Sequence, residues 1–518
     1  MNGAEALIKT AVDCGIEICF ANPGTTELPI VAALDRIAGI KAVLGLFEGV
    51  CTGAADGFGR MKGKPAMTLL HLGPGLGNGI ANLHNARRAH TPLVNIIGEH
   101  ATWHRPMDPP LAMDIEGLAK TVSIWVRTNA SAQELPKDMA EAVRAAASGG
   151  IASLIVPHDY QLGACTTQAP ALTGSAFDPL DHKEIEAAMR LLRAGQKTAL
   201  VLGGRALRRQ GLAIAARIQG MVGCDLLTET FPPVLEQGIG LAAVKRISYV
   251  PKAAQTMLGE YDGVVLAGAK DPVTFFGYPG VRSRMLSADQ QETAIGTGSQ
   301  DILEALAALA DSLKGQGSSG GAPDADAQYS RPSVPEGALT SAAVCQTVAA
   351  LQPEGAIIVD EGLTTSGRYY SMAAGLPPHT ILPLTGGAIG YGMPCALGAA
   401  LACPERPVIN FQADGSAMYT VQALWSQARE GSNITTLLCS NRSYRTLLGE
   451  LRTAGVEKPG KNAQILTALR DPVIDWVSCA RGLGVPAISV SDVSGLADAL
   501  KRSLTEPGPS LIEMVLAF

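Results

Sequence analysis

Two polar residues in the last third of the chain each follow an apolar run that is typical of a β-strand. Asp414 comes after PVINFQA, and Asn441 comes after ITTLLCS. In open α/β sheets, ligands bind at the carboxyl ends of strands, so both positions are candidates for a site. Mg²⁺ takes oxygen ligands, usually a few carboxylates together with phosphate oxygens. A carboxylate from Asp414, an amide oxygen from Asn441 and a backbone carbonyl near Ser443 therefore suit a diphosphate-bound Mg²⁺, although each residue alone reads as a turn residue.

Two further candidates for chemistry lie in the first third of the chain. Glu48 ends the strand-like run KAVLGLFE and opens a helical segment, where an acid alone is explained by the helix dipole. His71 follows the run PAMTLL, and an imidazole that titrates near neutral pH suits proton transfer. A single histidine at a strand end is usually structural, so neither Glu48 nor His71 by itself indicates a catalytic site.

A glycine-rich segment, GGAIGYG at residues 386–392, precedes a helix that begins near Met393. This segment, Glu48 and the spacing of Asp414 and Asn441 together resemble the motifs of the thiamine-diphosphate-dependent 2-oxo acid decarboxylase and carboligase family. The resemblance covers essentially the whole chain and implies a pyrimidine-binding, a middle and a diphosphate-binding domain. It also implies a homodimer at least, and often a homotetramer, because the two halves of such sites usually come from different subunits.

The resemblance assigns residues of this chain to the cofactor. Glu48 is expected to hold the pyrimidine N1′, Ile389 to keep the cofactor bent, and the Gly387 carbonyl to receive the 4′-amino group. The resemblance further implies that the activated cofactor, as an ylid, attacks the carbonyl of a 2-oxo acid. CO₂ would then leave as an enamine forms. The further cofactor contacts implied are Asn78, Gly362, Thr364, Asp414, Gly415, Ser416, Asn441, Ser443 and Tyr444, with Asp414, Asn441 and Ser443 as metal ligands.

These residues need strands and helices that hold them in place. Short β-branched runs alternate with helical patterns along the chain, which predicts parallel sheets covered by helices. We therefore predict an α/β protein of three domains, in which two parallel-sheet cofactor domains flank a smaller α/β middle domain. The predicted ranges are 1–170 for the pyrimidine-binding domain, 171–313 for the middle domain, 314–336 for a Gly/Ser/Pro/Asp-rich linker and 337–518 for the diphosphate-binding domain.

The composition excludes several classes of function. Lys and Arg total 41 against 47 acids, a net charge of -6, so we expect a small-molecule substrate and no nucleic acid. The ten cysteines form no CxxC pair, which favours reduced thiols in a cytoplasmic protein. The N-terminus reads as an amphipathic helix rather than a signal peptide. The uncharged stretch 369–404 is broken by glycines and prolines, so it is predicted to be buried backbone and not a membrane span.

The residues that would choose the substrate favour one branch of the family. NPGTTELP at residues 22–29 is similar to the NPGSNELP stretch of benzoylformate decarboxylases, which implies that Thr25 contacts the substrate carboxylate. His71 falls where those enzymes have a proton-relaying histidine. Their second active-site histidine is not found, because the corresponding segment at residues 272–278 reads PVTFFGY. An apolar wall or the Tyr278 hydroxyl would stand in for it.

Acetolactate synthase is the other near branch. GPGLGN at residues 73–78 is closer to its GPG loop, but LAMDIE at residues 111–116 replaces its phenylalanine-glutamine-glutamate stretch. The arginine-bearing flavin segment of its middle domain is also missing, so bound FAD is not expected. His100 and His104 lie in a loop that borders the site in relatives, and they are secondary acid–base candidates.

Three functions are therefore open. The first is a thiamine-diphosphate- and Mg²⁺-dependent 2-oxo acid decarboxylase with carboligase capacity, as in benzoylformate decarboxylase. The second is an acetolactate synthase-like carboligase that uses pyruvate. The third is a catalytically silent cofactor-binding homologue, because the second histidine is missing and Ala413 replaces the first glycine of the metal motif. If that position needed positive φ, the added Cβ would cost roughly 1 kcal/mol. If the methyl group crowded the diphosphate, the affinity for the cofactor would fall.

Overall fold

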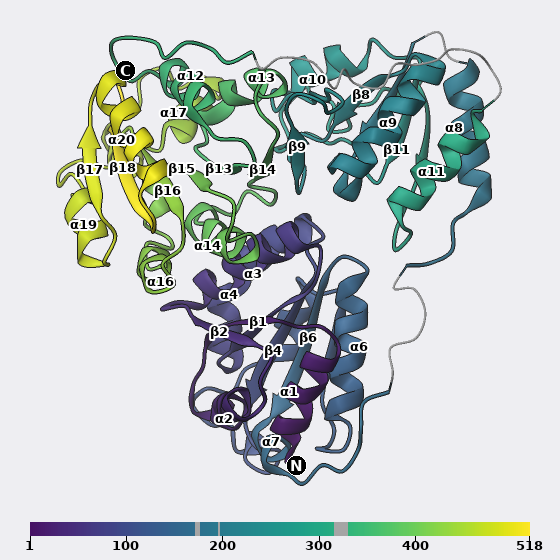
Figure 1. Cartoon of the computed structure of the whole chain (residues 1–518), viewed down its shortest axis with the longest axis vertical. Helices are drawn as coiled ribbons and strands as arrows, with labels where there is room; N and C mark the ends of the chain where they lie inside the picture. Colours follow the sequence, from purple (N-terminus) through teal and green to yellow (C-terminus); the bar gives the residue numbers. More distant parts are fainter. Residues whose placement is uncertain (171–176, 195–196, 315–329, 518) are drawn as a thin grey trace. The chain divides into compact units, whose positions relative to one another are not determined.

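The computed structural model describes residues 1–170, 177–194, 197–314 and 330–517, and in these ranges it contains three sheets built mainly of parallel strands, with accompanying helices (Figure 1). The predicted α/β class is thereby confirmed. The N-terminal sheet has six parallel strands in the order β2-β1-β3-β4-β6-β5. These strands are β1 (Ile18–Asn22), β2 (Lys41–Leu44), β3 (Ala66–Leu70), β4 (Leu93–Glu99), β5 (Trp125–Thr128) and β6 (Ile151–Pro157). The accompanying helices are α1 (Gly3–Asp13), α2 (Leu28–Arg36), α3 (Glu48–Lys62), α4 (Leu72–Arg88), α5 (Ile115–Lys120), α6 (Leu135–Ala147) and α7 (His158–Leu162).

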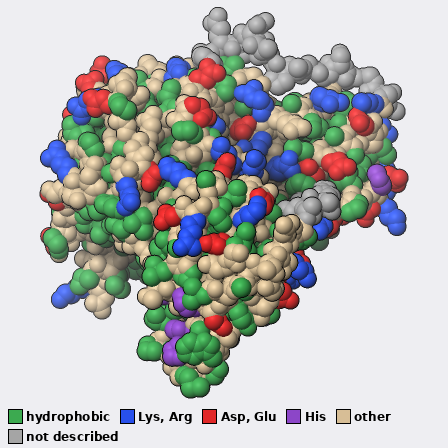
Figure 2. Space-filling model, turned by 60° about the horizontal axis from the view of Figure 1, so that its bottom comes forward, with side chains coloured by type: hydrophobic (Ala, Val, Ile, Leu, Met, Phe, Trp, Pro, Cys, Tyr) green, Lys and Arg blue, Asp and Glu red, His purple; other side chains and the backbone are tan. Residues whose placement is uncertain are grey.

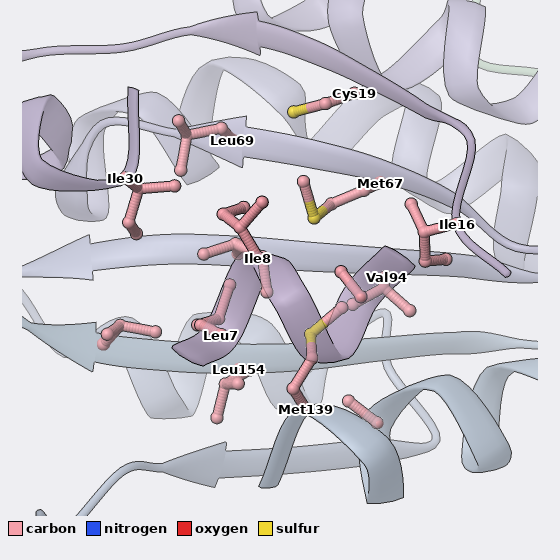
Figure 3. Packing of buried hydrophobic residues seen from close by; sticks show 14 of the residues in the cluster. Leu7, Ile8, Ile16, Cys19, Ile30, Met67, Leu69, Val94, Met139 and Leu154 are labelled. Carbon is pink, nitrogen blue, oxygen red and sulfur yellow. The ribbon is translucent and has the colours of Figure 1, made fainter. Parts of the chain in front are cut away.

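The core of this domain forms where helix α1 packs on the sheet (Figure 3). Asn2 and Glu5 start the helix with reciprocal hydrogen bonds, since each side chain accepts from the backbone N–H of the other residue, at 2.8 and 3.1 Å. Leu7 and Ile8 are fully buried beside strand and helix residues that include Met67, Val94, Met139 and Leu154. The amphipathic helix predicted at the N-terminus is confirmed by this packing.

The middle domain has five parallel strands in the order β10-β8-β7-β11-β12. The strands are β7 (Thr198–Leu202), β8 (Asp225–Thr228), β10 (Lys245–Arg246), β11 (Gly263–Ala267) and β12 (Gln291–Ile295), and the helices are α8 (His182–Ala194), α9 (Arg209–Val222), α10 (Pro251–Leu258) and α11 (Ile302–Ser312). A short antiparallel pair joins β9 (Leu235–Gln237) to β14 (His379–Pro383).

The C-terminal domain contains five parallel strands in the order β17-β18-β16-β15-β13. They are β13 (Ile357–Glu361), β15 (Val408–Ala413), β16 (Ile434–Ser440), β17 (Ala487–Val490) and β18 (Ser510–Val515). Its helices include α12 (Ser341–Leu351), α13 (Tyr369–Met372), α14 (Gly392–Ala402), α15 (Asp414–Ala417), α16 (Ala423–Arg429), α17 (Arg445–Thr453), α18 (Lys461–Thr467), α19 (Trp476–Gly482) and α20 (Val493–Thr505).

The described residues divide into two compact units. The first combines the N-terminal domain with residues 331–372 and 384–517, and the second combines the middle domain with residues 373–383. This last segment, which falls inside the predicted range 337–518, joins the middle domain because β14 pairs with β9. The predicted boundaries stay predictions, and most of the predicted linker, residues 315–329, lies outside the described residues. No helix within the described ranges is both long and apolar enough to cross a membrane.

Candidate active site

The ends of β15 and β16 bring Asp414 and Asn441 together. The two strands pair in register, with Ala413 opposite Cys439, so the residues that follow them meet at one edge of the sheet. Both side chains are buried, and the Asp414 carboxylate accepts hydrogen bonds from Gly415 N at 2.8 Å and from the backbone N–H of Arg442. Burial raises the pKa of Asp414, against the effect of these N–H donors. A buried carboxylate beside an amide oxygen is a donor set that a hard cation such as Mg²⁺ takes.

The backbone at Ala413 is extended, with φ -72° and ψ 144°. A residue with a Cβ adopts this conformation without strain, because only positive φ favours glycine. The departure from the family motif therefore carries no backbone cost at this position. We call residues 413–416 the metal loop.

Other predicted cofactor residues lie in the segments that follow β16 and β13. Tyr444 precedes α17, and its ring lies so close to Gly415 that a Cβ there would be 2.4 Å from the ring. Ser443 forms an isolated bridge with Ala468. Gly362 and Thr364 follow β13, whose last residue pairs with Gln412 of β15.

The glycine-rich residues 386–392, which we call the wedge loop, are held by polar side chains from both halves of the first unit. The Asn85 side chain of α4 forms hydrogen bonds with both backbone groups of Ala388. It donates to the carbonyl at 2.8 Å and accepts from the N–H at 3.2 Å. Gly387 and Gly390 have φ of 76° and 92°, which glycine adopts readily. Gly387 is exposed and Ile389 is half-buried, so both are accessible to a ligand.

Glu48 opens α3 and is only 8% exposed. Its carboxylate accepts a hydrogen bond from Asn78 of α4 at 3.0 Å. On the same helix, Asn82 donates to Gly49 O at 2.9 Å and to Gly390 O at 3.2 Å, which joins the start of α3 to the wedge loop. Asn82 therefore links the start of α3 to the wedge loop within the first unit of the chain.

A second group of polar residues lies where β1 and β3 end side by side. The chain leaves β1 to form β2 on one side and returns to form β3 on the other, so this edge is a topological switch point. Glu27 is fully buried, and its carboxylate lies 2.8 Å from the Nδ1 of His71 and accepts from the hydroxyl of Thr26 at 2.6 Å. Thr25 is exposed at the same turn.

The two groups approach each other across Gly75. A Cβ placed on this glycine would lie 3.1 Å from Glu48 Oε1 and 3.4 Å from the Cβ of His71. Glu48 and His71 therefore flank the same short stretch of α4. With Nδ1 engaged by a buried carboxylate, Nε2 is the nitrogen of His71 left for proton transfer.

The secondary histidines have different surroundings. His100 and His104 stack edge to face with ring centroids 5.7 Å apart in the loop after β4. His158, which was not predicted, lies 3.0 Å from Thr26 O through Nδ1. In the second unit, the exposed rings of Phe275 and Phe276 belong to an aromatic cluster with Tyr249 and the half-buried Phe231, and their predicted role as a substrate wall stays a prediction.

Several functional candidates were missed in the sequence. Asn78, Asn82 and Asn85 recur at helical spacing, and this polar stripe on a glycine-rich helix is a signal that could have found the last two. Glu27 and Glu361 look like ordinary acids in the sequence, and only their burial reveals them.

Comparison with known proteins identifies the family. Residues 1–118 match the thiamine pyrophosphate enzyme N-terminal TPP binding domain, and residues 360–514 match the C-terminal TPP binding domain. The chain is 47% identical to the "Putative acetolactate synthase large subunit IlvX" of Mycobacterium tuberculosis, over 100% of this chain and 99% of that protein. It is 30% identical to the benzoylformate decarboxylase of Pseudomonas aeruginosa, over 96% of each chain.

A solved structure gives the same fold. The thiamine diphosphate-dependent 4-hydroxybenzoylformate decarboxylase of Rhodococcus jostii RHA1 matches with a TM-score of 0.86 at 23% identity, over 100% of this chain and 99% of that chain. The protein therefore belongs to the thiamine pyrophosphate enzyme family. Within that family it is a thiamine-diphosphate-dependent enzyme of the C–C lyase and carboligase group, related to both benzoylformate decarboxylase and acetolactate synthase.

Proposed function

We propose that the protein is a thiamine-diphosphate- and Mg²⁺-dependent decarboxylase of a 2-oxo acid, with carboligase capacity. The observation that carries this proposal is the approach of Glu48 and His71 across Gly75, with Glu27 holding the His71 ring. A carboxylate suited to the cofactor and an imidazole suited to proton transfer would then serve the same reacting carbon. This combination supports a benzoylformate decarboxylase-like reaction.

The metal loop and its neighbours fit the diphosphate and its metal. Asp414 and Asn441 supply a carboxylate and an amide oxygen at adjoining strand ends, and the Ser443 carbonyl would complete the protein ligands. Asp414 is buried among N–H donors, and a bound cation would balance the charge of its carboxylate. The diphosphate oxygens would occupy the remaining positions around the ion.

Bound thiamine diphosphate supplies the electron sink for the charge that remains when CO₂ leaves a 2-oxo acid. Glu48 would hold the proton at the pyrimidine N1′, and the Gly387 carbonyl would accept from the 4′-amino group. The Thr25 hydroxyl would donate to the substrate carboxylate. His71 would transfer a proton through Nε2, because Glu27 engages its Nδ1.

An acetolactate synthase-like reaction is the second candidate. The 47% identical mycobacterial relative, which carries an acetolactate synthase name, favours it. In that case the bound two-carbon unit from pyruvate would be transferred to a second 2-oxo acid instead of being protonated. The silent homologue is less favoured, because the backbone at Ala413 carries no strain.

A product assay separates these functions. The purified protein is incubated with thiamine diphosphate, Mg²⁺ and either benzoylformate or pyruvate, and CO₂, aldehyde and acetolactate are measured. Aldehyde from the aryl acid supports the decarboxylase, and acetolactate from pyruvate supports the second candidate. Chelation of Mg²⁺ should abolish either activity. Cofactor binding without turnover of a broad 2-oxo acid panel would overturn both in favour of the silent homologue.

Substitution of Glu48 tests the assignment of the cofactor-activating acid. Glu48→Gln removes the charge but keeps the size, so we expect at least a ~100-fold fall in kcat with an unchanged circular dichroism spectrum. Glu134→Gln is the matched control, since Glu134 is an exposed acid before α6. Near-normal turnover of Glu48→Gln would contradict the assignment.

A further inference from the structure

Glu361 is a fully buried acid at the carboxyl end of β13. One carboxylate oxygen accepts from Gly390 N at 2.7 Å. The other accepts from Gly392 N at 2.7 Å and from the side-chain amide of Gln412 at 2.9 Å. These partners are all amides, so the carboxylate is stabilised by oriented dipoles.

The position of Glu361 at the start of α14 explains how the fold accommodates this acid. Gly392 is the first residue of α14, and the first N–H groups of a helix have no partners within it. A carboxylate at this end satisfies those donors and interacts favourably with the helix dipole. Burial raises the pKa of Glu361, and the hydrogen bonds from the amides act in the opposite direction. Glu361 therefore caps α14 from a neighbouring strand.

Gln412 connects Glu361 to the metal loop. Its side-chain amide donates to Glu361 and also to the Ser416 hydroxyl at 2.7 Å, and that hydroxyl donates to Ala413 O at 3.1 Å. Gln412 and Ser416 are each 1% exposed, so the connection is shielded from water. A continuous hydrogen-bonded path thus runs from the wedge loop through Glu361 to the metal loop.

Gly392 allows the helix to approach this path closely. A Cβ at residue 392 would lie 2.4 Å from the Gln412 side-chain oxygen and 2.8 Å from that of Asn410. A side chain there would displace the Gln412 and Asn410 side chains from their present positions. The geometry of this hydrogen-bonded path therefore depends on both Glu361 and Gly392.

We propose that Glu361 is a positioning residue that sets the spacing between the wedge loop and the metal loop, so that both ends of the cofactor bind at once. This inference rests on the proposed function, which assigns the wedge loop to the pyrimidine and thiazolium rings and the metal loop to the diphosphate. Glu361 itself contacts the two loops and not the reacting atoms.

The test compares a ligand that spans both loops with one that reaches only the metal loop. In Glu361→Gln, the new NH₂ faces N–H donors, so at least one hydrogen bond to the carboxylate is lost. We expect the Kd for thiamine diphosphate with Mg²⁺ to rise about 10- to 100-fold by calorimetry, the range for a lost hydrogen bond to a charged group. The Kd for inorganic pyrophosphate with Mg²⁺ should change by less than about threefold, because that ligand needs only the metal loop.

Glu513→Gln is the matched control, because Glu513 is a mostly buried acid on β18, separated from β13 by β15 and β16. It should leave both affinities unchanged. An equal loss of both affinities in Glu361→Gln, or no loss of either, would overturn the inference. Gly392→Ala disturbs the same path from the helix side. If Glu361→Gln does not fold, Gly392→Ala should likewise weaken the binding of thiamine diphosphate but not that of pyrophosphate.

Amide hydrogen exchange tests the positioning without any cofactor. Glu361→Gln should exchange faster than the wild type in both residues 386–392 and residues 413–416, whereas Glu513→Gln should not. If the wild-type protein does not bind thiamine diphosphate, the proposed function fails. In that case the hydrogen-exchange result alone decides whether Glu361 positions the wedge loop relative to the metal loop. Unchanged exchange in both segments would refute the positioning role of Glu361.

Discussion

At the scale of single residues, Glu27 gives His71 a defined orientation. Its carboxylate is fully buried and lies 2.8 Å from Nδ1, while the His71 side chain is 25% exposed. Gly24 makes room for this contact, because a Cβ there would lie 2.2 Å from Nδ1. A histidine held in this way presents Nε2 without reorientation during the reaction, which is the arrangement that favours proton transfer.

We predict that Glu27→Gln lowers kcat about 10- to 100-fold, because the ring loses its charged partner but stays in place. The losses from Glu27→Gln and His71→Ala should not add in the double variant, since both remove the same function. Steady-state kinetics of the two single variants and the double variant provides the measurement. Fully additive losses would mean that Glu27 acts on something other than His71.

At the scale of elements, a buried ion pair on α3 also binds the wedge loop and the residue that precedes it. Arg60 and Asp56 pair at 3.0 Å with almost no exposure, and Thr91 also donates to Asp56. The Arg60 guanidinium donates to Thr385 at 2.8 Å and to the Tyr391 hydroxyl at 2.7 Å. These contacts hold Thr385 and the C-terminal part of the wedge loop against helix α3 of the N-terminal domain.

Removal of one partner from such a pair leaves a buried charge unbalanced. Arg60→Met should therefore lower the free energy of unfolding by about 3–5 kcal/mol, measured by denaturant titration. Arg36→Met, which breaks the more exposed pair with Glu5, should cost less than about 1 kcal/mol. Equal stability of the two variants would show that the buried pair does not hold the two halves together.

At the scale of the whole molecule, apolar side chains remain uncovered on the C-terminal domain. No described residue of α17 is buried, and Leu447, Ile465 and Leu466 are 49%, 61% and 73% exposed. Hydrophobic side chains also lie among charged ones over the face drawn in Figure 2. Exposed apolar patches of this kind mark interaction surfaces, which agrees with the homodimer or homotetramer expected for the family.

We predict that sedimentation analysis gives a dimer at least, and that Leu466→Glu shifts the protein toward smaller species because a charge would be buried in the interface. Lys501→Glu on α20 is the control, since it changes an already polar surface. A monomeric wild-type protein would refute the predicted assembly.

Much of the fold and part of the candidate site follow from local sequence. Alternating strands and helices indicate parallel sheets, and the carboxyl ends of such strands are where ligand residues must stand. Asp414 and Asn441 are found in this way because each directly follows a recognisable strand. The prediction that Glu48 ends a strand is wrong, because β2 already ends at Leu44 and Glu48 is the first residue of α3. The conformation of Ala413, in contrast, depends on how β15 runs into α15, and only the structure shows that it needs no glycine.

The sequence by itself determined the cofactor family, the order of the domains and the residues at the strand ends. The tertiary structure alone decided which side chains support them. Arg60 reaches Tyr391, and Asn85 reaches Ala388, although more than 300 positions separate each pair. Glu361 meets Gly392 and Gln412 only because β13, β15 and α14 pack together. No local pattern specifies such partners, because a buried polar residue is recognised by the groups that surround it after folding.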